Sequence, residues 1–328
     1  MAENNKLKLE GEKIPLGLRL FRISEIGIII PLVLVILLFY LLKPVFLSGV
    51  NIRTVLNAAS FPGMIAIGMT FSLIVQQANL SVGAVAGLSA LTCSVLIVRM
   101  GLPIWASIII ALLAEISVGI INGFFSVKLK IPPIIVTLAM MFAVRGISFM
   151  ITKGYIVYPL PDSILRFGKA NPLNSSWSFV IFIILVIIFD FILRRTIIGR
   201  KIYATGADER VAIINGINAD MTKYLIHIAT TFLAGISGIL FMMNSGVGSP
   251  NTGLGWEFPV IAGTIIGGVS LLGGAGTIVG AFFGILLMQS IYNGMVMVGL
   301  KAEWQNIAIG TIMILTAGFD IYRRTRKT

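Results

Sequence analysis

The chain has 328 residues, of which 57% are hydrophobic and 12% are charged, and its net charge is +12. A soluble domain averages about 25% charged residues, so this composition excludes an ordinary soluble protein. The single cysteine, Cys93, excludes an internal disulfide and a multi-cysteine metal site. One histidine, His227, without an HExxH motif, argues against a zinc enzyme and favours a structural role for that residue. No metal site is predicted.

Long apolar runs such as Ile26–Leu42 and Phe179–Leu193 recur along the whole chain. A helix needs about 20 apolar residues to cross a bilayer, and the alternation of outer-membrane β-strands is absent from the sequence. The chain is therefore predicted to be an all-α polytopic membrane protein. The spans at 81–99 and 258–272 are short and rich in glycine, which predicts that some helices are broken. The ten predicted spans are roughly 24–42, 52–75, 81–99, 103–127, 132–152, 177–194, 223–243, 258–272, 276–297 and 303–320.

The distribution of basic residues supports this number of spans. Ten spans place both termini on one side together with 17 of the 25 Lys and Arg residues, and leave seven on the other side and Arg145 inside a span. Lys and Arg accumulate in cytoplasmic loops. Both termini and the loop 195–222 are therefore predicted to be cytoplasmic, and the positive charge requires no nucleic-acid partner.

The predicted organisation is one transmembrane domain, 24–320, between two cytoplasmic tails. The first tail, 1–23, is polar and basic and lacks the cleavage site of a signal peptide; the second, 321–328, is basic. Two halves are predicted to be pseudo-repeats, because Asn79-Leu-Ser-Val-Gly-Ala is faintly echoed by Val269-Ser-Leu-Leu-Gly-Gly. Glycine-rich segments also recur in any packed bundle, which is the alternative explanation.

The longest polar stretch between two apolar segments is the loop 195–222. Asp208 is predicted to cap a helix of about two turns, Glu209 suits the positive end of that helix, and Gly216 is a left-handed stop. A helix this short is unstable alone in water, so it needs either a cytoplasmic partner subunit, which is favoured, or anionic lipid. The candidate docking residues are Gly199, Arg200, Tyr203, Gly206, Asp208, Glu209, Arg210, Ala212, Asn215 and Gly216.

Three glycines recur every fourth residue inside the predicted span 276–297. Gly276, Gly280 and Gly284 are predicted to form a ridge that lets helices approach closely. The spacing is wrong for a dinucleotide-binding loop, and no strand precedes it.

Polar residues inside the spans are the remaining candidates, because they are costly in lipid. Glu115 and Arg145 are predicted to pair across neighbouring spans, either to fix packing or to relay a proton or substrate. Asp190 is predicted to lie close to Arg194, one helical turn later. Uncharged amides and hydroxyls could mark an ordinary span end or line a path for a hydroxylated solute. The candidate path residues are Gln77, Asn79, Ser81, Asn122, Thr137 and Arg145.

Nearly the whole chain resembles the permease subunits of ribose-type sugar ABC importers, which serve pentoses, hexoses and the autoinducer-2 signal. The resemblance is carried by Leu80-Ser-Val-Gly, Ile121-Asn-Gly, Ile135-Val-Thr-Leu, Arg145-Gly, Gly199-Arg-Lys-Ile-Tyr-Ala-Thr-Gly, Gly216-Ile and Ile266-Gly-Gly-Val-Ser-Leu-Leu-Gly-Gly-Ala-Gly. The chain departs from the family at Asn79, where Asp is usual. It also departs at Phe258-Pro-Val-Ile-Ala-Gly, where an alanine-rich run usually follows the acidic residue. Both departures lie near segments that could line the path, so they affect the expected substrate more than the expected fold.

The resemblance implies a second permease chain, ABC ATPase subunits that bind ATP and Mg, and an external sugar-binding protein that is periplasmic or lipid-anchored. It also implies that 199–217 transmits ATP-driven motion, that the outer loops 153–176 and 244–256 receive the binding protein, and that the chain lies in a bacterial cytoplasmic membrane. This chain itself would be non-catalytic and hold no cofactor, in agreement with its lack of a GxxxxGK[ST] loop.

Three alternatives remain open at this stage. An ion-coupled secondary transporter would use Glu115, Arg145 and Asp190 as coupling groups. A permease of a branched-chain amino-acid ABC importer is the nearest alternative. An intramembrane enzyme would need clustered carboxylates or histidines at one membrane face, whereas the acidic residues here are scattered singly.

Overall fold

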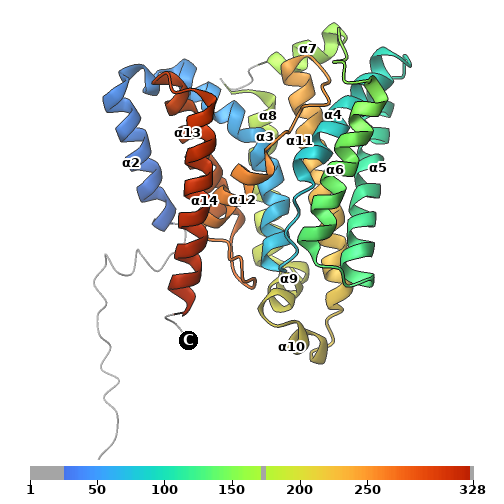
Figure 1. Cartoon of the computed structure of the whole chain (residues 1–328), viewed down its shortest axis with the longest axis vertical. Coiled ribbons are helices and arrows are strands. Elements are labelled where there is room, and N and C mark those ends of the chain that lie inside the picture. Colours follow the sequence, from blue (N-terminus) through green and yellow to red (C-terminus); the bar gives the residue numbers. More distant parts are fainter. Residues whose placement is uncertain (1–25, 171–174, 326–328) are drawn as a thin grey trace, which may run out of the picture.

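The computed structural model describes residues 26–170 and 175–325, and this part of the chain is built of helices and loops without strands (Figure 1). The predicted tail 1–23 lies outside the described residues. The elements are α2 (Ile26–Leu42), η1 (Pro44–Leu47), α3 (Gly49–Ile74), α4 (Val82–Val98), α5 (Ile104–Gly123), the π-turn η2 (Phe124–Lys128), α6 (Pro133–Thr152), α7 (Asp162–Lys169), α8 (Trp177–Arg195), α9 (Ile197–Ala207), α10 (Glu209–Ile214), α11 (Ala219–Ser245), α12 (Glu257–Ile266), α13 (Ile278–Met297) and α14 (Ala302–Thr325).

Within the described residues, six helices are long and apolar enough to cross a membrane: α3, α5 with η2, α6, α8, α11 and α13. The all-α membrane fold is therefore confirmed, while a count of ten spans is not. The predicted span 258–272 is wrong in extent, because α12 has only ten residues and ends at Ile266. Gly268, the residue after the C-cap Gly267, has a φ of +93° and directs the chain out of the helix. α14 continues to Thr325, past the predicted end of the last span.

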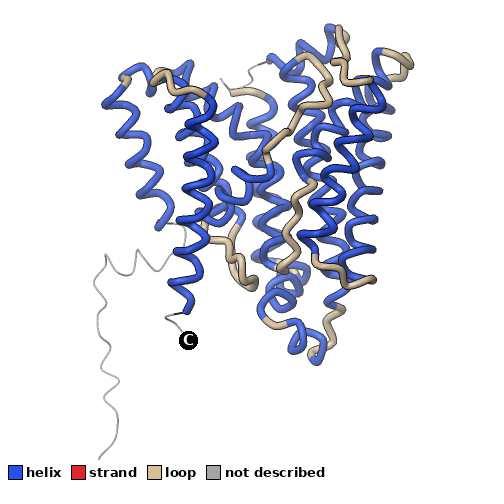
Figure 2. Tube along the Cα trace, in the orientation of Figure 1, coloured by secondary structure: helices blue, strands red, loops and turns tan. Residues whose placement is uncertain are grey.

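The same order of elements occurs twice in the chain. A long helix, an extended segment, a shorter helix and a further helix follow one another in α3, 75–81, α4 and α5, and again in α11, 246–256, α12 and α13. The two extended segments enter the bundle from opposite ends (Figure 2). The first turns of α4 and α12 then meet inside it, where Gly83 lies against the carbonyl oxygen of Gly253 and the carboxylate of Glu257.

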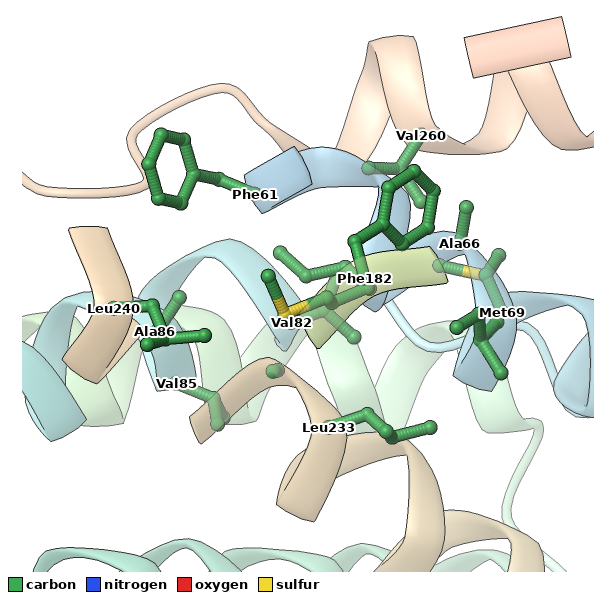
Figure 3. Packing of buried hydrophobic residues seen from close by; sticks show 14 of the residues in the cluster. Phe61, Ala66, Met69, Val82, Val85, Ala86, Phe182, Leu233, Leu240 and Val260 are labelled. Carbon is green, nitrogen blue, oxygen red and sulfur yellow. The ribbon is translucent and has the colours of Figure 1, made fainter. Parts of the chain in front are cut away.

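The two long helices α3 and α11 are largely buried and form the centre of the bundle. Side chains from α3, α4, α8, α11 and α12 meet there in one apolar core (Figure 3). Small residues bring the backbones close together: Gly68 of α3 packs on Thr230 of α11, and Gly238 of α11 packs on Ala86 of α4. Because lipid tails are as apolar as the side chains, such close packing supplies the attraction between helices in a membrane.

The two loops at the α7 end of the bundle are joined to each other. Val157 and Gly248 exchange two backbone hydrogen bonds, with N–O distances of 2.8 and 3.1 Å. The side chain of Asn244 also donates to the carbonyl oxygen of Gly168 at 3.1 Å. The described parts of the loops 153–176 and 244–256, which were predicted to lie on the outer side, are therefore connected to each other.

Candidate functional site

The loop between α8 and α11 folds into two helices, α9 and α10. Asp208 caps α10 as predicted, because its Oδ1 accepts hydrogen bonds from the backbone N–H groups of Arg210 (2.8 Å) and Val211 (3.1 Å). Gly216 adopts the predicted left-handed conformation, with a φ of +79°. α10 has six residues, close to the predicted two turns. α9 was not predicted; its signal in the sequence is Thr196, whose hydroxyl caps the first turn at Gly199.

The candidate docking residues divide into an inner set and an outer set. Gly199, Gly206 and Ala212 are buried, whereas Arg200, Asp208, Arg210, Asn215 and Gly216 are exposed. Tyr203 and Glu209 are half-buried, and Glu209 forms an ion pair of 2.7 Å with Lys223 at the start of α11. The inner set packs against the rest of the bundle, and the outer set lies on the surface.

The outer side of α10 also carries an apolar patch, Val211, Ile213 and Ile214. Their side chains are 53%, 56% and 83% exposed. α10 lies farther out than the ends of α3 and α6 (Figure 1). Exposed apolar residues grouped on a protruding element are typical of a protein interface. The run Val211-Ala212-Ile213-Ile214 is the signal for this patch in the sequence, and the charges and caps of the loop do not indicate it.

The helix α9 is hydrogen-bonded to the first extended segment and to the loop between α12 and α13. The hydroxyl of Tyr203 donates to the carbonyl oxygen of Gly276 at 2.6 Å, and burial raises the pKa of Tyr203, so the hydroxyl keeps its proton. Gln76, within the first extended segment, donates to the carbonyl oxygens of Leu272 (2.8 Å) and Gly206 (3.3 Å). A displacement of α9 would therefore also displace the loop after α12 and the segment before α4, to which it is hydrogen-bonded.

Gly206 explains why this junction needs small residues. A methyl group at Gly206 would collide with the carbonyl oxygen of Ile74. The backbone N–H of Gly274 donates to that same oxygen at 2.9 Å, and Gly274 has a φ of +70°. Three chain segments thus meet through their backbones, without room for side chains.

Five of the six candidate path residues come together around the first extended segment. Asn79 Oδ1 accepts from the hydroxyl of Ser81 at 2.6 Å, and that hydroxyl accepts from Asn122 Nδ2 at 3.1 Å. Thr137 Oγ1 accepts from the backbone N–H of Leu80 at 3.1 Å. Gln77 Oε1 lies 3.2 Å from Nε2 of His227, which gives that histidine the structural role predicted for it. All five are buried, so these groups hold the segment in place.

Arg145 lies apart from this network. Its Nη1 donates to the carbonyl oxygens of Pro250 (2.7 Å) and Thr252 (2.8 Å) in the second extended segment. The predicted pair of Glu115 and Arg145 is therefore wrong. Glu115 is fully buried beside Gly235, and neither of its carboxylate oxygens bonds to another described group. Asp190 and Arg194 form the predicted contact, at 3.0 Å.

The predicted glycine ridge is confirmed for two of its three residues. Gly280 and Gly284 of α13 pack against the carbonyl oxygens of Gly267 and Gly263 in and after α12. Gly276 lies before the helix, with a φ of +148°, and α13 begins only after its cap Thr277. Gly276 is thus a turn residue and the acceptor for Tyr203, which corrects its predicted place in the ridge.

Comparison with known proteins agrees with this architecture. A family described as "Branched-chain amino acid transport system / permease component" matches residues 51–317. The L-arabinose ABC transporter permease protein AraH of Azospirillum brasilense is 30% identical over 305 residues, which cover 93% of this chain and 90% of that protein. The autoinducer 2 import system permease protein LsrC of Photorhabdus luminescens is 31% identical over 292 residues, 88% of each chain.

The ribose import permease protein RbsC of Bacillus subtilis (strain 168) is 29% identical over 299 residues, which cover 90% of this chain and 92% of that protein. No solved structure matches the chain. The chain belongs to this family of transport-system permeases, in its ribose-type group of sugar and autoinducer-2 ABC permeases.

Proposed function

We propose that this chain is the permease subunit of an ABC importer for a monosaccharide, such as a ribose-like pentose, a hexose or a related sugar-derived signal. The relatives named above carry arabinose, autoinducer 2 and ribose in their names, which favours a sugar over a branched-chain amino acid. ATP and Mg would bind to a partner ATPase, and this chain would be non-catalytic. An external binding protein would deliver the sugar to the connected loops at the α7 end.

The apolar patch of α10 is the observation that best supports docking to an ATPase subunit. Val211, Ile213 and Ile214 project from a capped helix beside the positive charge of Arg210. Burial of such side chains is worth roughly 1.5–3 kcal/mol each, and a groove on an ATPase subunit would supply that burial. Anionic lipid could bind the basic residues equally well. It accounts less well for the exposed apolar residues of α10, because α10 lies beyond the ends of the spans.

The coupling route follows from the hydrogen bonds of α9. Motion imposed on α10 by the ATPase would pass to α9, and from there through Tyr203 to Gly276 and through Gln76 to Leu272. Both short helices, α4 and α12, are attached to the segments moved in this way. The network of Gln77, Asn79, Ser81, Asn122 and Thr137 and the anchor Arg145 would then hold the two extended segments beside the translocation path.

The orientation and assembly complete the proposal. The end that carries α9 and α10 would face the cytoplasm with both termini, as the bias of Lys and Arg requires, in a bacterial inner membrane. The repeated order of elements supports two pseudo-symmetric halves related as in other transporters. A second permease chain, identical or a paralogue, would complete the path.

Co-purification from the native membrane tests the docking role. A solubilised chain with Ile213→Ser and Ile214→Ser is expected to lose the ATP-binding subunit, while Ile156→Ser, a change of another exposed isoleucine at the α7 end, is expected to retain it. An ATPase retained by the Ile213→Ser, Ile214→Ser protein at wild-type level would refute docking through α10.

A further inference from the structure

A cavity of about 1200 Å³ opens between α3, α11, α12, α13 and α14. It adjoins a smaller cavity of about 330 Å³ that is lined by Gly168 and Lys169 at the end of α7. Thr54, Asn57 and Asn244 line both cavities. The large cavity therefore opens toward the α7 end, where the proposed binding protein would release its sugar.

One wall of this cavity is a cluster of three aromatic rings. Trp256, at the end of the second extended segment, stacks on Phe61 of α3 with ring centroids 6.3 Å apart, and meets the edge of Phe241 of α11 at 5.2 Å. All three rings line the cavity. Each ring fixes its neighbours, so the indole presents a rigid apolar surface, to which the C–H face of a pyranose or furanose ring is complementary.

The cavity lining also offers hydrogen-bonding groups that have no partner among the described residues. Gln289 and Tyr292 are three residues apart on α13 and so share one face of that helix. Asn306 of α14 lines the same cavity. None of these three side chains forms a hydrogen bond with another described residue. An amide and a hydroxyl both donate and accept, which suits the hydroxyl groups of a sugar.

None of the described residues that line the cavity is charged. A branched-chain amino acid carries a carboxylate and an ammonium group, and moving either charge out of water without a partner is costly. A monosaccharide has no charge and exchanges its water for amide and hydroxyl partners. The volume exceeds that of an ordinary small-molecule pocket, so the sugar would keep part of its hydration.

From these observations we infer that this cavity is a transit site for a monosaccharide, with Trp256 as the stacking surface and Gln289, Tyr292 and Asn306 as hydroxyl partners. The inference rests on the proposed function and adds a specific binding site within the permease itself. Selectivity would then be set in this chain as well as in the external binding protein.

Uptake by the complete importer in proteoliposomes tests the site. The variant Gln289→Leu with Tyr292→Phe is expected to import about five-fold less D-ribose or L-arabinose per ATP hydrolysed, since each lost hydrogen bond is worth about 0.5–1.5 kcal/mol. The matched control is Gln305→Leu with Tyr40→Phe, because neither residue lines the cavity. Wild-type import per ATP in the first variant would overturn the site and leave the proposed function standing, whereas ATP-independent uptake by the wild type would refute the proposed function.

Fluorescence gives a second measurement that needs no assembled importer. In the full chain with Trp105→Phe, Trp177→Phe and Trp304→Phe, Trp256 is the only indole. Titration with D-ribose, L-arabinose and L-leucine is expected to give a saturable change for at least one sugar and none for leucine, and the change is expected to weaken in Gln289→Leu. A response to leucine alone, or to none of the three, would overturn the inference.

Discussion

The hydroxyl of Tyr203 donates a hydrogen bond of 2.6 Å to the carbonyl oxygen of Gly276. This bond joins the element proposed to receive the ATPase to the loop between α12 and α13. It connects residues 73 positions apart in the chain, so it is a tertiary link between two parts that the proposed mechanism requires to move together.

Tyr203→Phe removes this bond and little else. We expect the variant to bind the ATPase normally but to import several-fold less sugar per ATP, because one hydrogen bond of about 0.5–1.5 kcal/mol no longer ties α9 to the loop. Parallel assays of ATP hydrolysis and uptake measure this ratio. Tyr155→Phe, at an exposed position of the opposite end, is the control. Equal ratios in the two variants would show that Tyr203 is not part of the coupling route.

Asp208→Ala removes the cap of α10. Loss of an N-cap costs about 0.5–2 kcal/mol, so α10 should fray and its apolar tip should bind the ATPase several-fold more weakly. Asp208→Asn keeps an acceptor oxygen and is expected to bind nearly as well as the wild type. The affinity of purified ATPase for the chain in nanodiscs measures both variants. If the two substitutions weaken binding equally, the charge of Asp208 matters rather than its cap.

Gly216→Val tests the turn after α10. No atom lies within 4 Å of a Cβ at this position, but the φ is +79°, and a β-branched residue is strained there by about 1–2 kcal/mol. We expect uncoupled ATP hydrolysis, with partial recovery in Gly216→Asn because Asn tolerates this conformation better. Normal coupled transport by Gly216→Val would count against the role of α10.

Gly280→Leu tests the packing of α12 on α13. A side chain at Gly280 collides with the carbonyl oxygen of Gly267, so we expect poor assembly and a lower unfolding temperature. Gly27→Ala in α2 is the control, because no atom lies within 4 Å of its added Cβ, and it should be neutral or slightly stabilising. Thermal unfolding in detergent compares the two, and wild-type stability of Gly280→Leu would contradict the close packing.

Glu115→Gln separates the ABC importer from an ion-coupled transporter. Glu115 has no charged partner among the described residues, and the proposed mechanism assigns it no proton to carry. Uptake driven by ATP is therefore expected to continue in Glu115→Gln, with little dependence on a pH gradient. Loss of a proton-coupled uptake that needs no ATPase would favour the alternative.

The sequence was sufficient for features that depend on neighbouring residues. The cap at Asp208, the left-handed Gly216 and the apolar spans all follow from local spacing. The end of α12, the turn at Gly276 and the partner of Arg145 could not be predicted in this way. The partners of Arg145 lie in the second extended segment. The backbone after α12 is held by residues distant in the chain, with Gly267 against Gly280 and Gly276 bonded to Tyr203.

ATP-dependent uptake of labelled sugar by the purified importer in proteoliposomes tests the proposed function most directly. We predict that this chain imports D-ribose, L-arabinose or D-xylose only when the ATPase subunit and ATP are present. The Ile213→Ser, Ile214→Ser chain is expected to import none of these sugars. Uptake by this chain alone, driven by an ion gradient without ATP, would contradict it.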